Sequence, residues 1–451
     1  MRLISLRLQN IKAFETLDLE FTNDGVKPRP WTLLLGDNAS GKTTILRCLA
    51  IGINDESSAA GLVREMKGSL VRKTRGKRSE GMILVGLIDS RGQPWTLKTI
   101  LTPLAKTGDR VRQRAYKLAV DKVPDGSFPD RPEKGFVPIE KFPWRQTFVC
   151  GYGAGRSIDG REEYTDYRTI DAVYTLFRYD QPLQSPELAW RRYQQRVVES
   201  RSKRTSKRVS IAWADRQISQ ILGAVLDMEK GKGPILREEG IHLRYGNRTV
   251  ALADHADGYR SVTTWLLDFI AWYLLYRKGI QVHRIGGVVL IDEIEQHLHP
   301  RWQRYLIGKL RKQFSKVQFI ATTHSPLCAA SAADLTADEC SLVRLSLDPK
   351  QQRIVASAVS LPYGERADQI LMSSAFGLID TRNPKIGDPL AEFRQLFRKP
   401  RPSPFDQRKM QRLAKEVKIA SPDLLQFQEE ARVERNLRQL IAESRSMRGL
   451  H

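Results

Sequence analysis

Apolar and polar side chains alternate along the first part of the chain, and the period then changes. Residues 3–8 and 17–21 carry an apolar side chain at every second position, the spacing that buries one face of a β-strand. Residues 31–35 have no charged interruption, which predicts a buried strand. A loop with glycines follows, and 42–53 have apolar residues at helical spacing. Strand, glycine loop and helix in this order predict the start of an α/β unit.

The same succession of strands and helices continues along the chain. Further strand-like segments are 82–88, 96–101, 147–150, 241–245, 288–291 and 317–320. Helical spacing begins at Ser185-Pro186-Glu187, which supplies an N-cap, a proline at the first helical position and an acidic first turn. Charged helical sequence, broken by prolines, follows from about 385. We therefore expect an α/β fold with two lobes at 1–184 and 236–384, an inserted helical segment at 185–235 and a helical tail at 385–451.

The net charge of the chain indicates which classes of molecule it can bind. The chain has 74 Lys and Arg against 51 Asp and Glu, a net charge of +23. This surplus predicts attraction to a polyanion, either nucleic acid or an anionic membrane surface. Basic runs at 64–78 and 191–208 would contact DNA phosphates, although a charge run is more often a solvated face. The apolar stretch at 265–276 contains Asp268 and is too short to span a bilayer. We expect DNA as a partner and no membrane association.

The spacing of the cysteines and the N-terminal residues indicate the cellular compartment of the protein. The four cysteines lie far apart and form no C-x-x-C pair, which excludes a disulfide scaffold and a cysteine-rich zinc module. Residues 1–10 lack the apolar run and the small-residue cleavage site of a secretory signal. We expect a cytoplasmic protein.

Residues 36–43 have the sequence Gly-Asp-Asn-Ala-Ser-Gly-Lys-Thr, which fits the phosphate-loop pattern G-x-x-x-x-G-K-[ST] at every fixed position. Its glycines let backbone N–H groups turn inward around phosphate oxygens, its lysine neutralises phosphate charge, and its hydroxyl reaches Mg²⁺. The segment lies between a predicted strand and a predicted helix, as a phosphate loop must. We expect a nucleoside triphosphate to be bound by Gly36, Asn38, Ala39, Ser40, Gly41, Lys42, Thr43 and Thr44, with Thr43 also a metal ligand.

An acidic pair follows the apolar run at 288–291. Asp292 would hold Mg²⁺ through its coordinated waters, and Glu293 would polarise the attacking water as the general base. The next predicted strand is followed by His324, which can hydrogen-bond a γ-phosphate. Two plainer interpretations stay open: an acidic pair that ends a strand at the surface, and a histidine with a structural role.

Taken in order, these residues resemble the ABC/SMC-type ATPase superfamily, in particular its RecF- and OLD-like branch. Residues 290–300 resemble Walker B and the D-loop, 323–326 resemble the switch-histidine motif, and 256–261 resemble the signature motif. The resemblance implies a two-lobed ATPase head that uses ATP and Mg²⁺ and forms a head-to-head homodimer or a higher even oligomer. Each nucleotide would lie between one subunit's phosphate loop and the other subunit's signature residues, Asp257, Gly258, Tyr259, Arg260 and Ser261.

Two departures from the family pattern bear on turnover. The signature of this superfamily usually begins with Leu-Ser, whose hydroxyl reaches the opposing γ-phosphate, and this chain has His255 and Ala256 there. The segment 151–156 stands where the family's Q-loop glutamine is expected. Loss of a donor to the γ-phosphate weakens transition-state stabilisation. We therefore expect slow hydrolysis, with ATP used to hold or sense an assembly.

The C-terminal part of the chain resembles one particular group of ATPases within this superfamily. Residues 361–371 and 376–382, with the helical tail, are similar to compact Septu-type ATPases of bacterial anti-phage defence. The resemblance implies control of a separate HNH-type nuclease, since the chain has no nuclease motif of its own. It also implies 385–451 as the docking segment, and a solvated helical appendage stays open as the plainer interpretation of this tail. Two alternatives stay open: a RecF-like DNA-repair ATPase, and a defence ATPase that acts as a scaffold and sequesters a Toprim effector.

Overall fold

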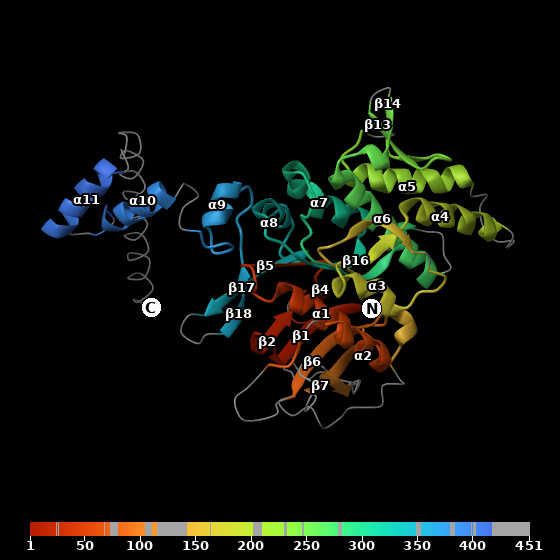
Figure 1. Cartoon of the computed structure of the whole chain (residues 1–451), viewed down its shortest axis with the longest axis horizontal. Coiled ribbons are helices and arrows are strands. Elements are labelled where there is room, and N and C mark those ends of the chain that lie inside the picture. The colour runs from red at the N-terminus through yellow and green to blue at the C-terminus, as the bar shows by residue number, and fades with distance from the viewer. Residues whose placement is uncertain are drawn as a thin grey trace, which may run out of the picture. The chain divides into compact units, whose positions relative to one another are not determined.

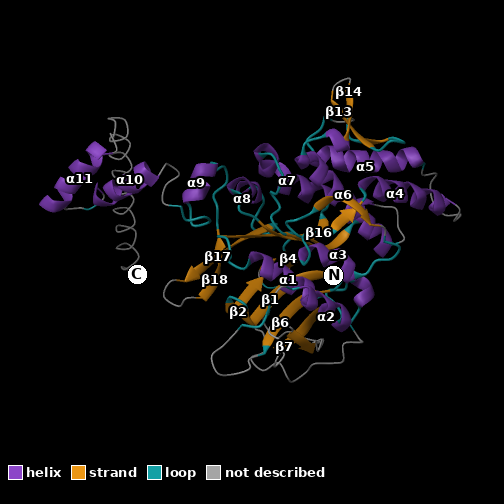
Figure 2. Cartoon of the chain, in the orientation of Figure 1, coloured by secondary structure: helices purple, strands orange, loops and turns teal. Residues whose placement is uncertain are grey.

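Two β-sheets and the helices around them form the first of two compact units of the chain, Met1–Ile370; the second unit is Leu371–His451 (Figures 1 and 2). The computed structural model describes residues 1–23, 25, 27–66, 68–72, 80–103, 111–114, 142–162, 164–201, 210–229, 232–245, 248–277, 282–348, 353–378, 384–397, 399 and 403–416. Strands and helices alternate along the first unit, so the expected α/β fold is confirmed.

The larger sheet has six strands in the order β18-β17-β5-β16-β15-β9. Their bounds are β5 Trp31–Gly36, β9 Val149–Tyr152, β15 Gly286–Ile291, β16 Lys316–Thr322, β17 Cys340–Asp348 and β18 Arg353–Val359. Neighbours from β17 to β9 run parallel, and β18 pairs antiparallel with β17 at one edge. β5, β15 and β16 are almost wholly buried, which explains their continuous apolar sequences. The carboxyl ends of the parallel strands lie along one edge, where α/β proteins bind ligands.

The second sheet is antiparallel and has five strands in the order β2-β1-β6-β7-β8. Their bounds are β1 Arg2–Ile11, β2 Phe14–Glu20, β6 Gly81–Ile88, β7 Pro94–Pro103 and β8 Val111–Arg114. Leu6 lies opposite Leu19 and Leu8 opposite Leu17, and all four side chains are buried. The alternation seen in the sequence therefore gives this sheet one apolar face.

Helix α1, Lys42–Gly52, packs between the two sheets (Figure 1). It contacts β5, β15 and β16 of the parallel sheet and β6 and β7 of the antiparallel sheet. The approach is close at Gly52, where an added Cβ would lie 2.4 Å from Cγ2 of Val85. The helix that follows the phosphate-loop sequence is therefore fixed on both sides.

Further helices pack around the sheets and on one another. Their bounds are α2 Glu56–Glu65, α3 Thr169–Val173, α4 Pro186–Arg201, α5 Ile211–Val225, α6 Asp257–Tyr276, α7 Pro300–Gln313, α8 Pro326–Ala333 and α9 Ala367–Met372. Three small sheets contain β3 Thr22–Asn23 with β4 Lys27–Pro28, β10 Ser157–Glu162 with β11 Pro182–Gln184, and β12 Ile235–Leu236 with β13 Ile241–Tyr245 and β14 Arg248–Ala251. α4 packs against α5 and α6, and α5 packs against α7. α4 begins at Pro186, and Oγ of Ser185 accepts the N–H of Leu188 at 3.4 Å, so the predicted helix start is confirmed.

The second unit contains two packed helices, α10 (Pro384–Phe397) and α11 (Pro404–Glu416). Phe393 and Leu396 of α10 and Leu413 of α11 form a small buried cluster. Apolar side chains at this spacing give each helix one apolar stripe, which the other helix covers.

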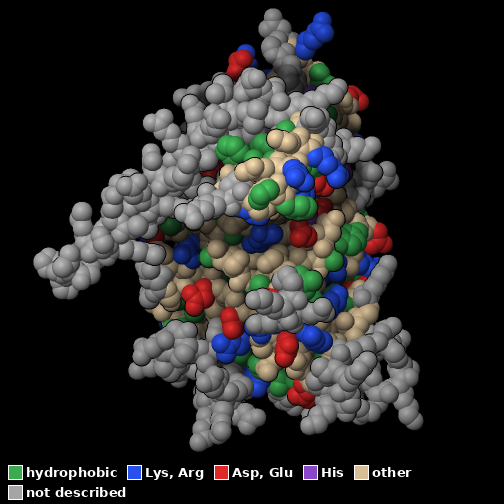
Figure 3. Space-filling view, turned by 90° about the vertical axis from the view of Figure 1, so that its left-hand side faces the viewer, with side chains coloured by type: hydrophobic (Ala, Val, Ile, Leu, Met, Phe, Trp, Pro, Cys, Tyr) green, Lys and Arg blue, Asp and Glu red, His purple; other side chains and the backbone are tan. Residues whose placement is uncertain are grey.

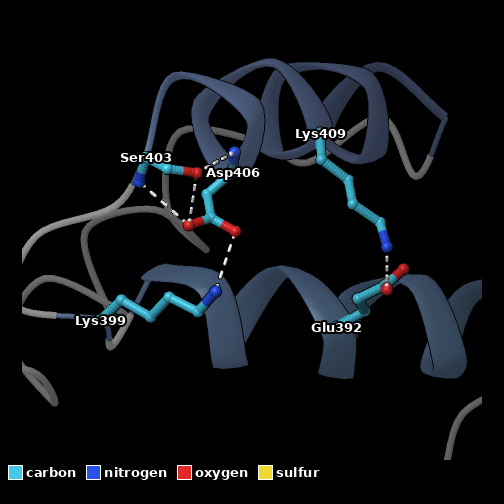
Figure 4. Close-up of polar contacts among 5 residues, drawn as sticks. All are labelled: Glu392, Lys399, Ser403, Asp406 and Lys409. Carbon is cyan, nitrogen blue, oxygen red and sulfur yellow. Dashed lines mark hydrogen bonds and ion pairs between the residues drawn. The ribbon is translucent and has the colours of Figure 1, made fainter.

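Polar contacts join the same two helices (Figure 4). Nζ of Lys399 lies 2.9 Å from Oδ1 of Asp406, and Lys409 pairs with Glu392. The N–H of Asp406 donates to Oγ of Ser403 at 3.1 Å, while the N–H of Ser403 donates to Oδ2 of Asp406 at 2.9 Å. This reciprocal pair is a capping box at the start of α11. Lys399 and these hydrogen bonds lower the pKa of Asp406 to about 2.

The expected limits of the four parts of the chain stay predictions. α4 and α5 lie within 185–235, and α10 begins at Pro384, next to the predicted start of the tail. The compact units, however, divide between Ile370 and Leu371. Residues 417–451 of the predicted tail lie outside the described residues. Across the described ranges, no helix combines the length and the apolar composition that crossing a bilayer requires.

Candidate nucleotide-binding site

Three residues from the end of β5 to the start of α1 have positive φ: Gly36 (147°), the last residue of β5, Ala39 (63°) and Gly41 (94°). An added Cβ at Gly36 would lie 2.5 Å from the carbonyl oxygen of Leu345, and one at Gly41 would lie 2.4 Å from Cζ of Phe14. Neither position has room for a side chain. Backbone conformation and packing therefore both require glycine at these two positions.

The amine of Lys42 lies inside this loop. Its Nζ donates to the carbonyl oxygens of Gly36 at 2.7 Å and Asp37 at 2.9 Å. The side chain is only 6% exposed, and burial lowers the pKa of the amine, an effect that nearby Asp292 opposes. A buried cation at a helix N-terminus is a favourable place for an anion. The other predicted loop residues lie as follows: Asn38 and Ala39 are exposed, Ser40 is buried, and Thr43 and Thr44 are half-buried at the start of α1.

Two hydroxyl groups fix the carboxylate of Asp292 at the end of β15. Oγ1 of Thr43 donates to Oδ2 of Asp292 at 2.8 Å, and Oγ1 of Thr322 donates to Oδ1 at 2.7 Å. Asp292 is 2% exposed. A hydroxyl and a carboxylate are the oxygen ligands that Mg²⁺ prefers. The structure thus brings the two predicted metal ligands, 249 residues apart in the sequence, into contact beside the phosphate loop.

Glu293 has a left-handed backbone, with φ of 48°. Its N–H donates to Oγ1 of Thr322 at 2.8 Å, and its carbonyl oxygen accepts a hydrogen bond from Nη2 of Arg156 at 2.7 Å. The next N–H, that of Ile294, donates to the carbonyl oxygen of Thr322 at 3.0 Å. This conformation is unfavourable for a residue with a side chain, so these contacts hold it in place.

The turn after β16 contains His324 and is held by Glu295. Oγ1 of Thr323 donates to Oε2 of Glu295, and the N–H of His324 donates to Oε1, both at 2.6 Å. His324 is half-buried. Glu295 therefore connects the segment after Asp292 to the predicted switch histidine. Glu295 was not among the predicted site residues, although a third acidic residue two positions after the acidic pair is visible in the sequence.

The predicted signature residues lie at the start of α6. No side chain caps this helix at Ala256. Gly258 is packed tightly, since an added Cβ would lie 2.7 Å from the carbonyl oxygen of His297. Asp257 and Arg260 form an ion pair at 3.6 Å, and Ser261 is buried.

A pocket of about 390 Å³ opens beside the start of α6. Its walls include Gly258, Tyr259, His297, Arg301 and Trp302, and the rings of Tyr259 and Trp302 meet edge to face with centroids 4.1 Å apart. No residue of the phosphate loop lines this pocket. The pocket beside the signature residues is therefore distinct from the phosphate loop.

A buried carboxylate, Asp268, connects α6 to the strand beside Asp292. Oδ2 of Asp268 accepts the hydroxyl of Tyr152 at 2.9 Å, and Oδ1 accepts the N–H and Nε2 of Gln184 at 3.0 and 3.2 Å. The carbonyl oxygen of Tyr152 in turn accepts the N–H of Asp292 at 2.8 Å. Burial raises the pKa of Asp268 from 3.8 to about 6. In the sequence, Asp268 is visible only as an interruption of an apolar run.

In the Asp268→Asn variant, the free energy of unfolding is expected to fall less with rising pH than it does in the wild type. The raised pKa means that the folded protein binds the proton more tightly than the unfolded chain, so stability falls as pH rises from about 4 to 6. Between about pH 5 and pH 7.5, the wild-type free energy of unfolding should fall by about 1 kcal/mol more than that of the variant. Urea denaturation at a series of pH values measures this difference, and parallel curves would contradict it.

The basic runs expected to contact DNA are only partly described. Residues 67, 73–79 and 202–209 lie outside the described residues. Nη2 of Arg191 donates to the carbonyl oxygens of Arg237 and Glu238 at 3.0 and 2.9 Å. Nη1 of Arg192 donates to Oε1 of Gln184 at 3.1 Å. These two arginines thus already make hydrogen bonds within the protein. Figure 3 shows the face at the left-hand side of Figure 1, away from α4, where basic side chains are interspersed with acidic and apolar ones. DNA binding stays a proposal.

Two segments of the chain match known protein families. Residues 5–85 match a family described as "AAA domain", and residues 262–330 match one described as "AAA domain, putative AbiEii toxin, Type IV TA system". Both matched segments of the chain resemble AAA-type ATPase domains. The first match covers the phosphate loop, and the second covers Asp292, Glu293 and His324. The AAA domain implies ATP as the nucleotide.

Similar proteins include members of two bacterial systems. The chain is 23% identical over 399 residues to "Septu protein PtuA" of Bacillus mycoides (88% of this chain, 48% of that protein). It is 34% identical over 117 residues to "Septu protein PtuA" of Bacillus thuringiensis (26% and 28%), and 21% identical over 384 residues to "Retron Ec83 probable ATPase" of Escherichia coli (72% and 69%). The chain thus spans about half or less of the length of the two Septu proteins it matches.

Similar solved structures include two SMC heads. One is an SMC head bound to the C-winged helix domain of ScpA, with a TM-score of 0.45 and 13% identity, covering 80% of this chain and 98% of that one. The other is the SMC head domain from Thermotoga maritima, with a TM-score of 0.40 and 15% identity, covering 80% of this chain and 100% of that one.

Proposed function

We propose that this chain is the Mg²⁺-dependent ATPase of an anti-phage defence complex, in which two copies close on ATP and control a separate nuclease. The observation that carries the proposal is the pair of hydrogen bonds from Thr43 and Thr322 to the two oxygens of Asp292, beside the buried amine of Lys42. These groups supply a carboxylate, a hydroxyl and a cation at the edge where parallel strands end, which is the chemistry that phosphoryl transfer requires.

The residues of the site would act in distinct ways on ATP. Lys42 would exchange the carbonyl oxygens of Gly36 and Asp37, which its Nζ now contacts, for phosphate oxygens. Thr43 and Asp292 would hold Mg²⁺, which would neutralise charge on the phosphates. Glu293 would accept a proton from the attacking water, and His324 would donate a hydrogen bond to the γ-phosphate.

Two subunits would complete each ATP site. The signature residues Asp257–Ser261 begin a helix whose start no side chain caps, and the adjacent pocket contains no phosphate-loop residue. A helix N-terminus of this kind binds anions, so a second copy of the chain would bring it to the γ-phosphate. Light scattering with and without ATP tests this arrangement in the Glu293→Gln variant, whose mass should double with ATP. A constant monomer mass together with no ATP binding would overturn the proposal.

Mixing two inactive variants should restore activity if the site is shared. Glu293→Gln removes the general base, and Arg260→Glu places a negative charge in the signature segment. A mixed dimer of the two contains one intact site, so an equal mixture should recover about a quarter of wild-type turnover. Phosphate release from the mixture, compared with each variant alone, measures this recovery. Additive rates without recovery would show that each subunit works alone.

The defence role rests on the relatives, two named Septu proteins and a retron ATPase. The proposed partner is an HNH-type nuclease, and the proposed docking segment is the tail that includes α10 and α11. Co-purification of the nuclease encoded beside this gene tests the partnership, with a chain that ends before α10 as the comparison. A neighbour with a Toprim domain, or replication genes in its place, would favour the scaffold or the repair alternative.

A further inference from the structure

An arginine is buried beneath the acidic end of β15. Arg156, directly before β10, is 4% exposed. Its Nη2 donates to the carbonyl oxygen of Glu293 at 2.7 Å, while its Nε has no hydrogen-bond partner. Removing a guanidinium from water is costly unless its charge and its donors are satisfied. A position this unfavourable, with one buried donor unpaired, indicates a role other than stability.

The backbone around Arg156 brings the side chain inward. An added Cβ at Gly153 would lie 2.1 Å from the carbonyl oxygen of Thr175, and one at Gly155 would lie 2.6 Å from that of Tyr179. Only glycine permits so close an approach. These two glycines press the segment after β9 against residues 174–179, and Arg156 follows at the point where the chain turns beneath Glu293.

The charges around Arg156 belong to the same site. Burial lowers the pKa of its guanidinium to about 10, and the carboxylates of Asp292, Glu295 and Glu293 oppose this lowering. Asp292 is the proposed metal ligand, Glu295 holds the His324 turn, and Glu293 is the proposed general base. The arginine therefore offsets negative charge at the point where all three meet.

We propose that Arg156 is a positioning residue for ATP hydrolysis, which holds the carbonyl of Glu293 and so keeps the general base in its left-handed backbone conformation. This inference rests on the proposed function. Two contacts fix the peptide groups of Glu293: its N–H donates to Oγ1 of Thr322, and its carbonyl oxygen accepts a hydrogen bond from Nη2 of Arg156. Without the second contact, the residue can relax toward an ordinary backbone conformation, which moves its carboxylate away from the attacking water.

Arg156→Met tests the role with little change in side-chain volume. It should lower kcat by about 10- to 100-fold, because a small misplacement of a catalytic group has an effect of this size, while the affinity for ATP changes by less than about threefold. Arg156→Lys keeps the charge and one donor and should recover part of kcat. Arg29→Met is the matched control, since Nε of Arg29 donates to the carbonyl oxygen of Ala337 at 2.8 Å and Arg29 precedes β5 at the opposite end of the strand from the phosphate loop.

A double-mutant cycle separates positioning from a direct role. If Arg156 acts through Glu293, then Arg156→Met should have little further effect on the slow rate that remains in Glu293→Gln. Equal losses in both backgrounds, or a wild-type kcat in Arg156→Met, would overturn this inference alone. A wild-type chain without ATPase activity would overturn the proposed function and this inference with it. Thermal unfolding of each variant shows whether it is folded, and Arg156→Lys carries the comparison if Arg156→Met is not.

Discussion

Replacing Glu293 with glutamine is expected to lower ATP turnover by about 100- to 10,000-fold, the usual contribution of a general base. The amide has nearly the shape of the carboxylate but cannot accept the proton of the attacking water. The contacts that fix this residue come from its backbone N–H and carbonyl, which the substitution leaves in place. The affinity for ATP should therefore stay within about threefold of wild type, and the ATP-bound dimer should accumulate.

Single-turnover phosphate release and calorimetric binding of ATP together check this expectation. Glu20→Gln is the matched control. Glu20 is exposed at the end of β2, so its substitution removes the same charge away from the phosphate loop. Turnover near the wild-type rate in Glu293→Gln would show that another group activates the water. A loss of ATP affinity as large as the loss of rate would show instead that Glu293 holds the substrate.

The elements around the phosphate loop were predictable because their signals are local. β5 has an uninterrupted apolar sequence because it is buried on both faces, and α1 follows directly after a loop whose glycines have positive φ. The same reasoning placed Asp292 and Glu293 at the end of a buried strand, and parallel pairing of β15, β16 and β5 then brings the ends of these strands together. Periodicity and glycine position are properties of a few neighbouring residues, so a sequence displays them directly.

The contacts that hold the site together were not predictable in the same way. Arg156 meets Glu293 across 137 residues, and Asp268 meets Tyr152 across 116. Each pair depends on which strands and helices become neighbours, and nothing in the flanking residues specifies that choice. A buried arginine and a buried aspartate are also indistinguishable, in sequence alone, from charged residues on a solvated face. The strand β17, which lies between β18 and β5, was likewise not among the predicted strands, although residues 343–348 alternate between apolar and polar side chains.

Replacing Lys42 with alanine is expected to abolish ATP binding at ordinary nucleotide concentrations, with a loss of affinity of about 100-fold or more. Charge-assisted hydrogen bonds contribute roughly 1.5–3 kcal/mol each. The amine of Lys42 points into the phosphate loop, where it donates to the carbonyl oxygens of Gly36 and Asp37. The substitution leaves the glycines that shape the loop, and the packing of Phe14 on Gly41, unchanged. The unliganded variant should therefore melt within a few degrees of wild type.

The stabilisation that ATP confers provides the measurement. A ligand at about 100 times its dissociation constant stabilises a folded protein by about 2.7 kcal/mol, so wild type should show a clear rise in melting temperature with ATP and Mg²⁺. Lys42→Ala should show none at the same concentrations. Lys316→Ala is the control, because Lys316 is exposed at the opposite end of the neighbouring strand β16. An equal rise in Lys42→Ala would mean that ATP binds elsewhere, because the phosphate loop without this amine has lost the cation that a triphosphate requires.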